Sequence, residues 1–61
     1  MKQYKEFYHI VNYDRFEFEQ NLAKYMRQIK ENGHGIEVQY HPVYDGRKIT
    51  FCAFVLGYTE E

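Results

Sequence analysis

Apolar and polar residues alternate in two segments near the C-terminus, 36–43 and 48–58, on either side of Tyr44-Asp45-Gly46-Arg47. Alternation of this kind predicts β-strands, because successive side chains of a strand point to opposite faces. Asp-Gly between two such segments is a strong hairpin signal, since both turn positions then tolerate a positive φ. With Asp45 and Gly46 at the tip, the expected cross-strand pairs are Tyr40/Phe51, Val38/Ala53 and Ile36/Val55. These six side chains share one face, which we predict to be the core face.

The opposite face of the hairpin is also rich in apolar side chains, so the second strand of the hairpin is apolar on both sides. Such a strand is typically central in its sheet and covered on both faces. We predict an interface on this second face, formed by Val43, Cys52, Phe54, Leu56 and Tyr58 with His41 and Gln39 at the rim. A second copy of the chain, related by a two-fold axis, is the expected cover. The alternative is that the first strand or the termini fold over it.

A helix is predicted between Asp14 and Gly33. Asp14 is the expected N-cap, and Glu17 three residues later completes a capping-box pattern. Gly33 suits the position after the helix, where a left-handed conformation is common. The apolar stripe expected to face the sheet consists of Phe18, Leu22, Tyr25, Met26 and Ile29. Phe16 lies off this stripe and either packs against the first strand or is exposed for a partner.

A first strand is predicted over residues 4–11, where Tyr, Phe, Ile and Val are frequent. Tyr8 and Ile10 are the expected inward side chains. The element order β-α-β-β and a right-handed crossover predict an α+β fold with one helix on a three-stranded sheet of order 1-3-2. Pro42 cannot donate a ladder hydrogen bond, so it predicts an edge or a bulge in the second strand. Residues 1–61 form one domain, and the expected dimer forms through the sheet.

Composition narrows the function classes. Eight Lys and Arg against nine Asp and Glu give a net charge of −1, which disfavours nucleic-acid binding. The sequence has no apolar run long enough for a signal peptide or a membrane span, so a cytoplasmic location without membrane contact is expected. Cys52 is the single cysteine, which rules out an intrachain disulfide. Seven Tyr and five Phe suit a protein interface, although small proteins also fill thin cores with aromatic residues.

No pattern of catalytic or metal-binding residues is present. His9, His34 and His41 lack the spacing of a paired metal site, and we predict no metal ion and no cofactor. Cys52 has His41 as a diagonal neighbour in the predicted hairpin, but a flat mid-strand position has no oxyanion hole or pocket. We therefore predict that the protein is not an enzyme.

The β-α-β-β plan of about sixty residues ends in Phe51-Cys52-Ala53-Phe54-Val55-Leu56-Gly57-Tyr58 and also contains Ile36-Glu37-Val38-Gln39-Tyr40. In these features the chain resembles a family of small sporulation-associated proteins of unknown function and their small phage-encoded relatives. It is also similar to short phage proteins that inhibit bacterial defence systems, including an inhibitor of the Hachiman system. The resemblance covers most of the chain and implies an obligate small dimer that acts by binding. It carries no functional residue over to this sequence.

The expected function is therefore that of a non-catalytic interaction protein, a homodimer that binds and inhibits or modulates another protein, such as a phage anti-defence inhibitor. The first alternative is a module that binds a small molecule or nucleotide, with aromatic rings stacking on a base and phosphate bound by Arg15, Arg27, Arg47 and Lys48. The second alternative is a sporulation-associated accessory protein.

Overall fold

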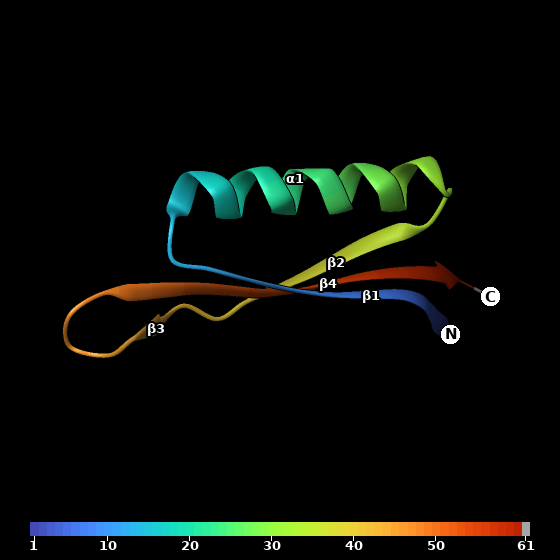
Figure 1. Cartoon of the computed structure of the whole chain (residues 1–61). Coiled ribbons are helices and arrows are strands. Elements are labelled where there is room, and N and C mark those ends of the chain that lie inside the picture. Colours follow the sequence, from blue (N-terminus) through green and yellow to red (C-terminus); the bar gives the residue numbers. More distant parts are fainter. Residues whose placement is uncertain (61) are drawn as a thin grey trace.

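A single helix lies along one face of an antiparallel sheet (Figure 1). The computed structural model describes residues 1–60. The elements, in chain order, are β1 (Lys2–Asn12), α1 (Arg15–Glu31), β2 (Gly35–Tyr40), β3 (Val43–Tyr44) and β4 (Ile49–Glu60). The strands are arranged as β1-β4-β2, and β3 pairs with β4. The predicted small α+β fold with one helix is confirmed.

The predicted three-stranded sheet of order 1-3-2 is wrong in detail, because the strand predicted as second is divided into β2 and β3. The backbone N–H of His41 donates to the carbonyl of Cys52 at 2.8 Å, and the ladder is then interrupted at Pro42. Proline has no N–H to donate, so regular pairing stops there. Pairing resumes where Val43 lies opposite Thr50, and the second half of the hairpin continues past the first turn of α1 (Figure 1).

The hairpin register differs from the predicted one by two residues. Tyr40 lies opposite Ala53, Val38 opposite Val55 and Ile36 opposite Gly57. The cause is the turn, in which Gly46 has a positive φ of 95° and Asp45 does not have a positive φ. Asp45 instead closes the turn, because its Oδ1 accepts from the backbone N–H groups of Arg47 at 2.9 Å and Lys48 at 3.0 Å. A shift of two residues leaves every side chain on its predicted face.

Both ends of α1 are closed by local hydrogen bonds. Asp14 is the N-cap, and its Oδ1 accepts from the backbone N–H of Glu17 at 3.1 Å. The capping box also predicts that the Glu17 side chain accepts from the Asp14 backbone N–H. This part is wrong, because the Asp14 N–H donates to the Asn12 side chain at 2.8 Å. At the other end, Gly33 has a φ of 79° and the His34 N–H donates to the Ile29 carbonyl at 3.2 Å. This Schellman arrangement turns the chain directly into β2.

The core lies between α1 and the two strands β1 and β4. Its buried members are Ile10, Phe18, Ile29, Ala53 and Val55. The expectation that Val38 and Tyr40 also belong to the core is wrong, because their side chains are 38% and 51% exposed. Both residues belong to β2, an edge strand of the sheet. A single helix is about 10 Å wide and cannot shield every strand of the sheet equally.

Glu6 forms a hydrogen-bond cluster beneath the C-terminal end of α1. Its Oε2 lies 2.6 Å from His34 Nδ1, while its Oε1 accepts from the Tyr8 hydroxyl at 2.8 Å and from the Asn32 amide at 3.0 Å. The hydrogen bond from His34, followed by that from Tyr8, lowers the pKa of Glu6 below its ordinary value. Gly57 makes room for this carboxylate, since a Cβ there would lie 3.0 Å from Glu6 Oε2.

The Glu6 cluster predicts a specific acid sensitivity. A carboxyl group whose pKa is lowered on folding stabilises the fold above its unfolded pKa, and this stabilisation is lost as the pH falls through the lower, folded value. The wild type is therefore expected to lose stability below pH 4.5, the ordinary pKa of the group. In Glu6→Gln this part of the pH dependence should be absent in urea titrations between pH 3 and 6. Exposed Glu31 provides the control: Glu31→Gln should keep the wild-type slope, and an unchanged slope in Glu6→Gln would contradict the assignment.

Candidate interaction surface

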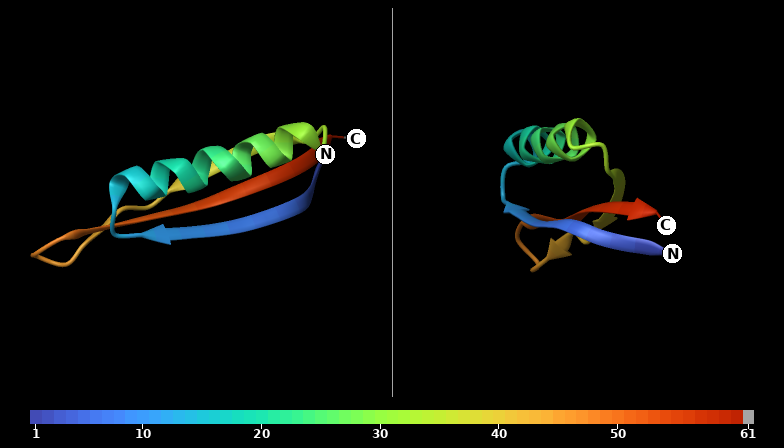
Figure 2. Two further views of the ribbon diagram at one scale, coloured as in Figure 1. Left: turned by 45° about the horizontal axis from the view of Figure 1, so that its top comes forward. Right: turned by 90° about the vertical axis from the view of Figure 1, so that its right-hand side faces the viewer.

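The sheet face opposite α1 has no layer over it within residues 1–60 (Figures 1 and 2). The inward positions of β4 are Ala53, Val55 and Gly57, which are buried. Alternation therefore directs the intervening side chains to the other side. The cross-strand partners extend this surface, the open face, over β1, β2 and β3. It consists of Phe7, His9, Val11, Glu37, Gln39, His41, Val43, Cys52, Phe54, Leu56 and Tyr58.

Phe54 lies at the centre of the open face, surrounded by rings from both neighbouring chain segments. The His9 imidazole stacks on it, with centroids 4.5 Å apart and planes inclined by 16°. His41 approaches the same ring edge-on at 5.8 Å, and Phe7 lies 5.5 Å away. These contacts join side chains of neighbouring chain segments on the same face of the sheet. They fix the positions of the rings but do not add a layer over them.

A polar rim closes the open face near the chain termini. The Tyr4 hydroxyl donates to Glu37 Oε2 at 2.9 Å, and Lys2 Nζ lies 3.8 Å from Glu37 Oε1. Lys2 also lies over the Tyr58 ring at 4.5 Å, and the Tyr58 ring covers Gly35, where a Cβ would come within 2.4 Å of it. The hydrogen bond to Glu37 raises the pKa of Tyr4. The Glu37 carboxylate is thus already paired with neighbours of its own chain.

The structure places all seven predicted interface residues on the open face. The four from β4 are half-buried, and Gln39, His41 and Val43 are exposed. The β1 contribution was missed, although Phe7 and Val11 are 65% and 49% exposed there. Their alternation with His9 was the available signal. It was ambiguous because both faces of the first strand carry apolar residues. Phe16 was expected either to pack against the first strand or to be exposed. It is 67% exposed on α1.

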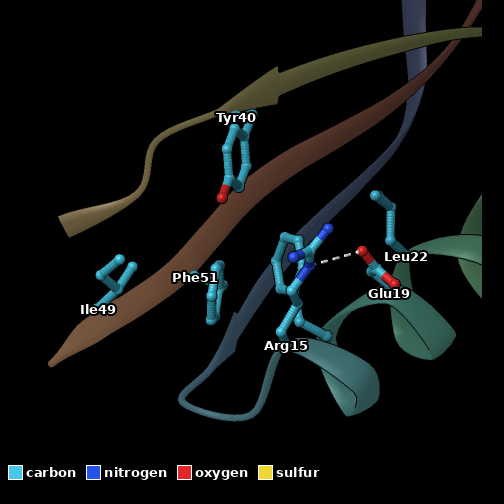
Figure 3. Close-up of a pocket in the computed structure, with 7 residues that line it drawn as sticks. Arg15, Glu19, Leu22, Tyr40, Ile49 and Phe51 are labelled. Carbon is cyan, nitrogen blue, oxygen red and sulfur yellow. Dashed lines mark hydrogen bonds and ion pairs between the residues drawn. The ribbon is translucent and has the colours of Figure 1, made fainter.

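A concave surface lies on the helix side, beside the edge of the sheet. This groove has a volume of about 520 Å³ and is lined by Arg15, Phe18, Glu19, Leu22, Tyr40, Ile49 and Phe51 (Figure 3). Its floor and walls are mostly apolar. Arg15, at its rim, is held by Glu19, with Nε and Oε1 3.1 Å apart. Of the four cations predicted to bind phosphate, only Arg15 lines the groove, so the other three do not converge with it.

The candidate reactive groups are dispersed. Cys52 is a free thiol whose Sγ lies 4.0 Å from the Thr50 carbonyl oxygen. His34 is engaged with Glu6 on the helix side of the sheet, away from His9 and His41. Among residues 1–60, no cluster of three or more His, Cys, Asp or Glu side chains has the geometry to hold a metal ion.

Comparisons with protein-family models, with curated proteins and with solved structures found no match. In the part of the chain that the structure describes, α1 is not long and apolar enough to cross a membrane.

Proposed function

We propose that this protein is a non-catalytic interaction module, and that its open face binds a second copy of the same chain. The observation that carries the proposal is the strand β4, whose alternate side chains are apolar on both faces while α1 covers only one of them. An exposed, contiguous apolar face rimmed by polar groups is typical of a protein-binding surface. A homodimer is the simplest partner, because a two-fold axis lets one surface meet its own copy.

The shape of the molecule supports a dimer. The Cα trace extends 44 × 20 × 10 Å, so the molecule is flat, and a second copy can pair with the open face along one of its broad sides. The arrangement of the open face also supports a dimer: aromatic and aliphatic side chains lie in the middle, and the pair of Lys2 and Glu37 lies at the rim. Charge depletion at the centre is the compositional mark of an interface core.

A dimer formed in this way leaves the helix side outward for a protein target. The groove lies on that side, and two of its lining residues, Tyr40 and Ile49, are exposed apolar side chains. The proposal is thus a dimeric binding protein with two copies of an outward apolar surface. Inhibition or modulation of the target, including the anti-defence role, stays a prediction.

Sedimentation velocity of the wild-type chain tests the dimer. Between about 1 and 100 µM, the expected result is a single fast-exchanging boundary that shifts from monomer to dimer mass. Thiol modification of Cys52 gives a second readout, since a dimer through the open face should slow it as the protein concentration rises. A monomer throughout this range would overturn the proposal.

A further inference from the structure

We infer that the dimer is sensitive to pH through His9 and His41, which hold the centre of the open face together only while both imidazoles are neutral. This inference rests on the proposed dimer and assigns its regulation. The two histidines lie on either side of Phe54, with ring centroids at 4.5 and 5.8 Å from that of Phe54. A two-fold interface would bring four imidazoles into one desolvated patch.

The surroundings of the two imidazoles provide no compensating negative charge. Neither imidazole has a hydrogen-bond partner within residues 1–60. From β2, the nearest carboxylate on this face is Glu37, four residues before His41 along the chain and thus about 13 Å away. That carboxylate is occupied by Tyr4 and by Lys2, which is itself a cation.

The other titratable groups of this face belong to residue types that ordinarily keep one charge state between about pH 5.5 and 7.5. β1 contributes Lys2 and Tyr4 at the rim, and β4 contributes Cys52, Tyr58 and, opposite Lys2, Glu60. The helix contributes no group here, because it lies on the opposite side of the sheet (Figure 2). Protonation therefore places unpaired positive charges where the two copies meet, and burying such charges is unfavourable.

The expected size of the effect follows from proton linkage. Each imidazole that must lose its proton on association raises the dimer Kd by up to about tenfold for each pH unit of acidification. The dimer holds four such imidazoles, so partial linkage of any of them is enough for a measurable change. We expect the wild-type Kd to rise at least tenfold between pH 7.5 and 5.5. The pKa of Glu6 is lowered from its ordinary value of 4.5, chiefly by the hydrogen bond from His34, so its carboxylate keeps its charge at pH 5.5.

The test compares the wild type with the double variant His9→Gln/His41→Gln in sedimentation velocity at pH 7.5 and 5.5, with circular dichroism to verify the fold. His34 is present in both proteins, so any effect of His34 on the Kd is the same in both. Dissociation of the wild type at pH 5.5, with an unchanged Kd in the double variant, is the expected result. A wild type that is dimeric at both pH values would overturn the inference and leave the proposed dimer intact, whereas a wild-type monomer at pH 7.5 would overturn both.

Dissociation of both proteins at pH 5.5 would assign the effect to other groups and would also overturn the inference. Should the double variant fail to fold or to dimerise, His9→Gln and His41→Gln are compared singly with the wild type. Dilution calorimetry at pH 6.0 in two buffers of different ionisation enthalpy counts the protons taken up when the dimer dissociates. Net uptake is the expected result, and the absence of uptake would contradict the role of the histidines.

Discussion

Phe7→Lys is expected to abolish the proposed dimer and leave the fold in place. Phe7 is 65% exposed on the open face, beside the central ring of Phe54 at 5.5 Å. A lysine here would lie in the desolvated core of the interface, and two-fold symmetry would introduce the charge twice. We expect the dimer Kd to rise by at least about 100-fold, which corresponds to roughly 2.7 kcal/mol. Sedimentation velocity at micromolar concentration measures this directly.

Phe16→Lys provides a matched control on the other side of the molecule. Phe16 is 67% exposed, nearly the same as Phe7, but it belongs to the first turn of α1. Both variants exchange an exposed phenyl ring for an ammonium group, so the net charge changes by the same amount. The dimer should survive in Phe16→Lys. If Phe16→Lys dissociated the dimer and Phe7→Lys did not, the interface would lie on the helix side, contrary to our proposal.

The helix could be predicted nearly to the residue because its signals are local. Asp14 and Gly33 act through hydrogen bonds to residues within a few positions, and the structure contains both caps. The Glu17 half of the capping box was wrong for a reason the pattern does not contain. Asn12 occupies the Asp14 N–H, and the Asn12 amide also donates to Glu17 at 3.2 Å. Competition between neighbouring polar side chains decided this detail.

Face assignment could be predicted for the hairpin, whereas register could not. Alternation assigns each side chain to a face, but shifts of two residues keep the same alternation. The register was decided by the Asp45 carboxylate, which accepts from Arg47 and Lys48 and places Gly46 and Arg47 at the tip. Asp-Gly in a sequence does not distinguish this arrangement from one in which both residues form the tip.

The contribution of β1 to the open face depended on pairing that is remote in sequence. β1 has a register shift between Tyr4 and Glu6, so Tyr4 lies opposite Tyr58 and Glu6 opposite Gly57. One extra residue in a strand reverses the alternation on its two sides. Tyr4 therefore reaches the open face together with Phe7, while Glu6 points beneath α1. A strict period of two would instead place Tyr4 and Glu6 on one face.

Ile29→Ala is expected to be the most destabilising single substitution in the core. Ile29 has no exposed surface, and its Cγ2 lies 3.0 Å from the position that a Cβ on Gly57 would occupy. The helix and β4 thus approach closely at this point, and the backbone carbonyl of Ile29 also accepts the His34 N–H that ends the helix. Removing a buried isoleucine to alanine costs about 2–5 kcal/mol. In a domain of this size the core supplies about 3–5 kcal/mol in all.

Urea denaturation of Ile29→Ala should therefore show a protein that is largely unfolded or close to it in the absence of urea. Leu22→Ala is the control on the same helix, because Leu22 is only half-buried and lines the open groove, so a smaller cavity is left. Both variants must be measured at several protein concentrations, since association adds apparent stability by mass action. An equal or larger loss in Leu22→Ala would place the packing centre of the core beneath the first half of α1 rather than at Gly57.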